Sequence, residues 1–319
     1  MRKVLSKSDF TVLSHLSTQA NESLIQRELA DELDWDSGYT SRVVSRLAES
    51  ELLVREQQNG RYWISLSSTE PTRLFADLAR EFPHVDFPEL LAGSTIQILY
   101  YLNAERTVAE LTDWTDVSRA TAYRRLKRLR NVGIVTKRDT RFALTSQFEE
   151  LAGFARSLVH HLHRQEASEH AAGVRLIWTD VDEYLFSCRT DVTTSFFHQT
   201  GPDALGQYGI ELLTREEQYY FRSEDRAELT AEDFVCHLLL IDDGARYRSY
   251  SLLLIAACEI NADALTKTAE RYEREAEIPL SEIVQDLCAY LDSDGAVSGE
   301  KLPEWDTFKS TAADYDVSV

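Results

Sequence analysis

The chain lacks an apolar N-terminal stretch of the kind that forms a secretory signal, because MRKVLSKSDF becomes polar at once. It also lacks long apolar runs. One of the longest, Leu252 to Cys258, is far shorter than the roughly 20 residues that a membrane-spanning helix needs. We therefore expect a cytoplasmic protein with no membrane partner.

Cysteine is scarce and unpaired. The four cysteines are scattered without a CxxC motif: Cys188, Cys236, Cys258 and Cys288. In a large intracellular chain this pattern predicts buried, reduced thiols and argues against a disulfide framework.

Motifs for enzymatic chemistry are missing too. The chain has no GxxxxGK[ST] phosphate loop and no GxSxG nucleophile elbow. Asp180 and Asp182 form a DxD pair, which binds magnesium in nucleotidyltransferases, but no Gly-Ser element precedes it. A turn between two strands is the favoured role for this pair. We expect no enzymatic activity and no cofactor; an enzyme housed in residues 173–319 is the rival hypothesis.

Lysine is rare, with seven lysines among 34 basic residues, while 54 acidic residues give a net charge of −20. This composition resembles that of proteins from salt-loving archaea. The charge is uneven: residues 1–171 carry a net −2 and residues 172–319 a net −18. Acidity therefore argues against a nucleic-acid partner only for the C-terminal half.

The chain does contain an internal repeat, offset by 82 residues. The segment from Arg27 to Glu56 aligns with that from Ala109 to Arg138, so that Leu29 matches Leu111 and Arg42 matches Arg124. The other matches also fall at apolar and basic positions. Such positions define one supersecondary unit that occurs twice.

The second copy predicts three helices and a hairpin. Leu91 to Leu102 is the first helix, and Val108 to Trp114 the second, with a capping box between Thr107 and Glu110. Ser118 is the predicted N-cap of the third helix, in which Ala122, Leu126 and Leu129 form one buried face. Gly133 ends that helix, and Ile134–Thr136 and Phe142–Thr145 are short strands.

The first copy predicts the same plan, with helices over Ser8–Ser17, Ile25–Leu33 and Ser37–Ser50 and a hairpin of Leu52–Arg55 and Tyr62–Leu66. Both copies resemble the winged helix-turn-helix domains of MarR and ArsR transcription regulators. The resemblance implies a mixed, mainly α fold and binding to double-stranded DNA. The expected parts are winged-helix domains over 1–70 and 88–146, a linker helix over 71–87, a connecting helix over 147–171 and an α+β domain over 172–319.

The third helix of the second copy is the predicted DNA reader. Val117 to Arg141 holds nine basic residues and one acid; the alternative is a solvated charged face. Arg119 and Arg124 suit guanine, and Thr121 and Tyr123 suit phosphate or thymine methyl groups. The expected DNA-contacting residues of this copy are Arg119, Thr121, Tyr123, Arg124, Arg125, Lys127, Arg128, Lys137, Arg138 and Arg141.

The first copy offers fewer basic residues, and Glu49, Glu51 and Glu56 offset them. Its alternative role is dimerisation or packing on the second copy. The residues expected to contact DNA from this copy are Thr40, Arg42, Arg46 and Arg61.

The connecting helix, Gln147 to His170, carries an apolar stripe made by Phe148, Leu151, Ala155, Leu158 and Leu162. The stripe packs either on its own domains or against a second copy in a homodimer, which would place two recognition helices on a palindrome. The histidines of this helix do not converge, so no metal site is expected.

The C-terminal half predicts strands at VRLIWTD, EYLFSCR and QYYFRS, followed by four helices. TGPDALGQYGI, from Thr200 to Ile210, together with QYYFRSEDR and AEDFVCHLLLID, resembles type IV abortive-infection antitoxins. That resemblance implies an autorepressor whose acidic domain engages a nucleotidyltransferase-type partner. A third possibility is that the winged helices are protein-docking modules.

Overall fold

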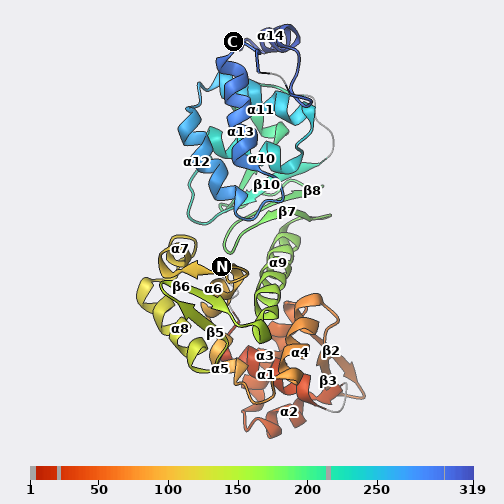
Figure 1. Cartoon of the computed structure of the whole chain (residues 1–319). Helices are drawn as coiled ribbons and strands as arrows, with labels where there is room; N and C mark the ends of the chain where they lie inside the picture. Colours follow the sequence, from red (N-terminus) through yellow and green to blue (C-terminus); the bar gives the residue numbers. More distant parts are fainter. Residues whose placement is uncertain (1–4, 20–22, 213–216, 298) are drawn as a thin grey trace. The chain divides into compact units, whose positions relative to one another are not determined.

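The computed structural model describes residues 5–19, 23–212, 217–297 and 299–319 of the chain (Figure 1). It divides into two compact units, Met1–Gln165 and Glu166–Val319. The boundary lies inside one long helix, α9 (Glu150–His170), and not at the predicted position of 171/172. With the boundary at 165/166, the whole excess of acidic residues lies in the second unit. The first unit has 22 basic and 22 acidic residues, and the second has 12 basic and 32 acidic residues.

The first unit contains the same order of elements twice. In the first repeat, residues 5–66, three helices precede a hairpin, and a short strand joins the hairpin to make a sheet of order β1-β3-β2. The predicted helices are confirmed, and the hairpin strands are longer than expected because only Asn59 and Gly60 form the turn, both with positive φ. The elements are α1 (Lys7–Thr18), β1 (Ser23–Ile25), α2 (Gln26–Glu32), α3 (Ser37–Glu49), β2 (Leu53–Gln58) and β3 (Arg61–Leu66).

The second repeat, residues 87–144, has the equivalent sheet of order β4-β6-β5. The capping box is confirmed: the amide of Thr107 donates to the Glu110 carboxylate (2.7 Å), and the amide of Glu110 donates to the Thr107 hydroxyl (3.2 Å). The elements are α5 (Phe87–Leu91), α6 (Thr95–Tyr101), β4 (Arg106–Thr107), α7 (Val108–Asp113), α8 (Arg119–Asn131), β5 (Val135–Arg138) and β6 (Arg141–Leu144).

The single helix expected over Leu91–Leu102 is wrong. The structure has two short helices there, α5 and α6, separated at Gly93, which has a φ of 73°. The amide of Gly93 donates to the carbonyl of Leu5 (3.1 Å), so the chain leaves the helical path to bind the start of the first repeat. Only glycine adopts this backbone conformation without a steric penalty.

The repeat also extends to individual backbone hydrogen bonds. The amide of Leu52 donates to Leu47 (2.9 Å), and 82 residues later the amide of Ile134 donates to Leu129 (3.0 Å). The second residue after each third helix is left-handed, with Glu51 at a φ of 53° and Gly133 at 79°. The two copies thus share the backbone geometry that joins the third helix to the hairpin.

Each repeat is followed by a helix that packs into the same unit. After the first comes α4 (Glu70–Glu81), whose Phe75 and Leu78 are buried against α1, so the expected linker helix over 71–87 is instead part of the core. After the second come the single turn η1 (Ser146–Phe148) and α9. All five residues of the predicted apolar stripe are buried within the chain, which leaves the stripe unavailable as a homodimer interface.

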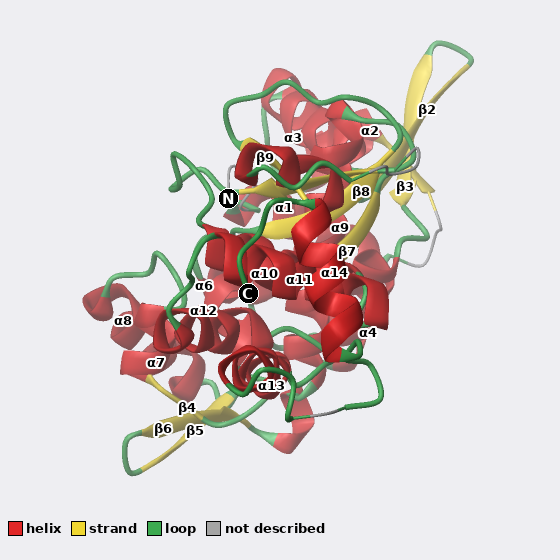
Figure 2. Ribbon diagram, turned by 90° about the horizontal axis from the view of Figure 1, so that it is seen from above, coloured by secondary structure: helices red, strands yellow, loops and turns green. Residues whose placement is uncertain are grey.

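The second unit is an α+β domain with a four-stranded antiparallel sheet of order β7-β8-β10-β9. Figure 2 shows β7, β8 and β9 of this sheet in yellow. The three predicted strands and four predicted helices are present; β9 and α14 were not predicted. The elements are β7 (Arg175–Thr179), β8 (Tyr184–Cys188), β9 (Phe197–Thr200), η2 (Pro202–Tyr208), β10 (Gln218–Arg222), α10 (Ala231–Ile241), α11 (Ala245–Ala257), α12 (Ala262–Glu273), α13 (Leu280–Asp292) and α14 (Trp305–Asp314).

The core of the second unit contains one buried polar chain. The Tyr272 hydroxyl donates to the Asp233 carboxylate (2.8 Å) and therefore accepts from Nε2 of His237 (2.9 Å). The other ring nitrogen, Nδ1, then accepts from the Thr200 hydroxyl (2.9 Å). Every partner suits a neutral histidine, and burial lowers the pKa of His237 to about 3.

Candidate nucleic-acid interface

The start of α8 is ordered by a short chain of side-chain contacts. Ser118 is its N-cap, as predicted, and accepts from the amide of Thr121 (3.3 Å). The Ser118 hydroxyl also donates to that of Thr121 (3.1 Å), which in turn accepts from Nη2 of Arg124 (3.5 Å). Thr121 thus holds Arg124 and is less free to contact a ligand than we expected.

The outward face of α8 carries four of the predicted side chains: Arg119, Tyr123, Arg124 and Lys127 are all exposed. Tyr123 is 44% exposed, which is high for a large aromatic ring, and the Arg119 guanidinium lies 5.8 Å from the centre of that ring. The face therefore presents two exposed guanidinium groups near the helix N-terminus, one beside an aromatic ring and one hydrogen-bonded. Such groups match the acceptor pair of guanine in the major groove.

Two other predicted contacts on α8 are held by the protein itself. Arg128 donates to the Glu89 carboxylate through Nη2 (2.8 Å). Arg125 is half-buried, and within the described residues its Nε has no hydrogen-bond partner. Burial lowers the pKa of the Arg125 guanidinium, and Nη2 lies beside Gly93, 3.2 Å from where a Cβ would be. Neither side chain is free to meet a phosphate as we predicted without first giving up these contacts.

The hairpin of the second repeat is basic but partly neutralised. Arg138 lies 3.8 Å from Glu105, and Arg141 lies 3.6 Å from Glu110. The pKa of Glu110 is lowered, chiefly by the hydrogen bond from the Thr107 amide, so this carboxylate stays charged. Lys137 is exposed, and its Nζ lies 5.6 Å from the centre of the Phe142 ring.

In the first repeat the structure contradicts the exposure expected of Thr40, and it pairs the exposed Arg46 with a buried acid. Thr40 is fully buried, and its hydroxyl donates to the Asp36 carbonyl (3.0 Å), so its expected place on the outer face is wrong. Arg46 donates to the buried Asp9 carboxylate through Nε (3.0 Å) and Nη2 (2.5 Å) and has a structural role. Arg42 and Arg61 are exposed, as predicted.

The sequence reasoning missed an arginine in the first hairpin. The Arg55 guanidinium lies 4.0 Å from the centre of the Tyr62 ring and donates to the Ser45 hydroxyl on α3 (2.9 Å). At the start of α3, Tyr39 contacts Trp35 (5.0 Å between ring centres) and lies 6.0 Å from Arg42. Basic and aromatic residues lie close together in β3 (Arg61 and Tyr62) and in α3 (Tyr39 and Arg42), and this is the signal that could have identified a second candidate face on the first repeat.

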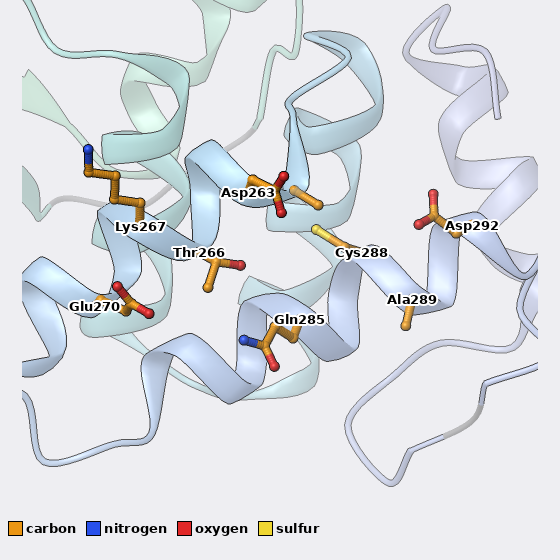
Figure 3. A pocket seen from close by; sticks show the side chains of 9 residues that line it. Asp263, Thr266, Lys267, Glu270, Gln285, Cys288, Ala289 and Asp292 are labelled. Atoms are coloured by element: carbon orange, nitrogen blue, oxygen red, sulfur yellow. The ribbon is translucent and has the colours of Figure 1, made fainter.

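A separate groove of about 440 Å³ lies between α12 and α13 of the second unit (Figure 3). Asp263, Glu270 and Asp292 line it together with Lys267, over a floor that includes Cys288. The lining has mixed charge, and burial raises the pKa of the Cys288 thiol. In the described part of the chain no three His, Cys, Asp or Glu side chains are grouped to hold a metal ion.

The DxD pair lies where the sequence placed it, in the turn between β7 and β8. Asp180 is buried, accepts from the amide of Val181 (2.8 Å) and lies 3.9 Å from Arg274. Its carboxylate is thus used to shape the turn. Among the described residues, no helix combines the length and the apolar composition that crossing a bilayer requires.

Two family models match parts of the chain, and each covers less than half of it. The model described as bacterial regulatory protein, arsR family, matches residues 95–137, from α6 into β5. A model described as HVO_2833_C, C-terminal, matches residues 194–317, within the second unit. A search among curated proteins finds no match. Residues 95–137 are thus similar to the DNA-binding helix-turn-helix of ArsR-type regulators, with α7 and α8 as its two helices.

Proposed function

We propose that this chain is a transcriptional regulator that reads an operator in double-stranded DNA through α8. The observation that carries the proposal is the outward face of α8, where Arg119, Arg124 and Lys127 are exposed within the segment that matches the ArsR family model. An exposed helix of 13 residues following a helix-turn-helix corner fits the major groove.

The basic residues of α8 and of the second hairpin would have different roles in binding DNA. Arg119 and Arg124 would read base edges, each through bidentate hydrogen bonds to guanine, whereas Lys127 and Lys137 would contact phosphates. Arg125 and Arg128 would hold α8 against α5 and Gly93 and so fix its orientation. Phosphate contacts weaken steeply with salt, so a chain adapted to concentrated salt would depend more on the base contacts.

We further propose that both repeats are winged-helix units and that the chain performs no catalysis. The second unit would then serve regulation, by binding an effector or a partner protein on its acidic surface. The antitoxin-like resemblance favours a nucleotidyltransferase-type partner, and a neighbouring gene encoding such a protein would support it. The acid-rich, lysine-poor composition suits a protein from a salt-loving archaeon.

The test is binding of the purified full chain to the DNA upstream of its own coding sequence, against scrambled DNA, across a salt series. The Arg119→Ala/Arg124→Ala variant should lose selective binding, because each two-pronged guanine contact contributes about 1–3 kcal/mol. The control is Arg73→Ala/Lys309→Ala, which removes the same charge from exposed positions outside the helix-turn-helix segments.

Selective binding that only the α8 variant loses would support the regulator. Equal, salt-sensitive binding of both DNAs, or no binding, would contradict operator reading and favour the protein-docking alternative. Retained binding by the α8 variant would place the reading surface elsewhere.

A further inference from the structure

The two repeats of the first unit meet each other at equivalent positions. Lys7 begins α1, and the residue 82 positions later, Glu89, lies in α5; Nζ of Lys7 donates to the Glu89 carboxylate (2.9 Å). This contact raises the pKa of Lys7 and lowers that of Glu89, each chiefly through the hydrogen bond. A residue contacts its own equivalent when the two copies are related by a twofold axis that passes between them.

A second contact, one residue from self-equivalence, joins the helices that follow the two hairpins. The second hairpin is four residues shorter, as the matched bonds from the amides of Ser67 and Thr145 show, so the offset falls from 82 to 78. Phe75 of α4 is then equivalent to position 153, and its ring contacts the neighbouring Phe154 of α9 (5.5 Å between ring centres). Equivalent helices thus meet at equivalent positions to within one residue.

The α4 and α9 helices run in opposite directions (Figure 1). Glu70, at the start of α4, accepts from Ser157 (3.0 Å), whereas Phe82, just after its end, contacts Phe148, just before α9 (4.4 Å between ring centres). Residue numbers therefore increase along α4 in the direction in which they decrease along α9. A twofold axis perpendicular to a pair of equivalent helices produces this antiparallel order.

From these contacts we propose that the first unit is an internal, pseudo-twofold pair of winged-helix repeats in which α3 is a second DNA-reading helix. One chain would then bind a two-part operator by itself, without a second copy. The proposal rests on the proposed function, because it takes α8 as the first reader. It replaces the homodimer expected from the apolar stripe, since that stripe is buried by packing α9 within the chain.

The equivalent structural role of two arginines supports the pairing of α3 with α8. Arg46 and Arg128 are 82 residues apart, and each pairs with an acid on the helix that opens its own repeat: Arg46 with Asp9 and Arg128 with Glu89. In each repeat, an ion pair from this arginine therefore joins the third helix to the first helix. The exposed Arg42 of α3 is equivalent to Arg124 of α8, which is one of the two proposed guanine readers.

The two proposed DNA-reading helices, α3 and α8, differ in how many basic side chains they can offer to DNA. On α3, Ser37 and Ser45 stand where α8 has Arg119 and Lys127, so the only basic residues that helix exposes are Arg42 and Arg46, and Arg46 is paired with Asp9. The Arg55–Tyr62 pair adds a guanidinium from the hairpin, and Arg61 is exposed at its tip. We expect the operator to contain a strong half-site read by α8 and a weaker half-site contacted by α3, hence an imperfect palindrome.

The experiment selects duplexes from a library randomised over about 30 bp, three helical turns. The selected duplex is then used for light scattering of the complex and for hydroxyl-radical footprinting. We expect one chain per duplex and two protected patches on one face of the DNA, a whole number of turns apart. Arg42→Ala should remove protection from one patch and leave the other, while Arg73→Ala, a matched loss of one exposed arginine on α4, should change neither.

Two chains per duplex, or a single patch that Arg42→Ala leaves intact, would overturn the proposal while leaving the regulator function standing. If the wild-type chain selects no sequence, the regulator function fails, and with it the role of α3. The internal pair is then decided by zero-length carbodiimide cross-linking of the wild-type chain, which joins an amine to a carboxylate in contact with it. An amide between Lys7 and Glu89 of one chain supports the pair, and one between chains, or none, contradicts it.

Discussion

Arg42 and Arg46 lie one turn apart on α3 but have different surroundings. Arg46 neutralises Asp9, whose side chain is 2% exposed, whereas Arg42 is exposed beside Tyr39. We expect Arg46→Ala to lower the free energy of unfolding by about 1–3 kcal/mol, because it leaves a buried carboxylate without its charged partner. Arg42→Ala should change it by less than about 0.5 kcal/mol. Urea denaturation of both variants measures the difference, and an equal effect would contradict the structural role of Arg46.

The stability of the second unit should depend on pH through His237. Burial holds its pKa at about 3, whereas an unfolded histidine titrates near 6.5. Between these values the unfolded chain binds a proton that the folded domain does not, so stability falls as the pH falls. From about pH 7 to 5 this linkage amounts to about 2 kcal/mol. The His237→Gln variant should be less stable at pH 7 but should lose about 2 kcal/mol less between the two pH values; a parallel loss would contradict the assignment.

At the residue scale, the repeat register held more information than our prediction used. Thr40, which we expected to contact DNA, aligns with Ala122, which was expected in the core, so the register places Thr40 inside, as the structure does. The pairing of Arg128 with Glu89 was beyond reach, because nothing local in the sequence indicates which distant acid meets a surface arginine. The same holds for Arg125, whose burial depends on the break at Gly93.

Among elements, two glycines should respond to alanine in opposite ways. Gly133 ends α8 at a φ of 79°, where a Cβ adds strain, whereas Gly153 lies in helix α9 with open space around it. We expect Gly133→Ala to destabilise the first unit by about 1–2 kcal/mol and Gly153→Ala to stabilise it by about 0.5–1 kcal/mol. Thermal unfolding of the two variants tests the signs. Stabilisation by Gly133→Ala would show that the left-handed turn is not required.

Element prediction succeeded where caps and periodicity agreed, as in α7 and α8 with their caps at Thr107 and Ser118. It failed at α5 and α6, because one continuous apolar pattern hid a break made by a backbone hydrogen bond to Leu5, far away in sequence. The short edge strand β9 was missed because its four residues show no clear alternation and are fixed by pairing with β10. Tertiary contacts, not local preference, define both.

For the whole molecule, the division of charge between the units is the dominant feature. The first unit has equal numbers of acidic and basic residues and carries nine of its 22 basic residues on α8 and the second hairpin, while the second unit holds the entire net charge of −20. The first unit can therefore approach a polyanion while the second repels it. Salt acts on the two units differently, because it screens the repulsion among carboxylates that a balanced unit lacks.

That difference predicts separate responses to salt in one unfolding experiment. As KCl rises from about 0.1 to 1 M, the Debye length falls from about 10 to 3 Å. We expect the second unit's unfolding temperature to rise by about 3–10 °C, which corresponds to roughly 1–3 kcal/mol for a domain of this size, while the first unit serves as the internal control and shifts less. Calorimetry records both transitions, and the transition that His237→Gln lowers is that of the second unit. A larger shift in the first unit would mean that packing, and not carboxylate repulsion, limits the stability of the acidic domain.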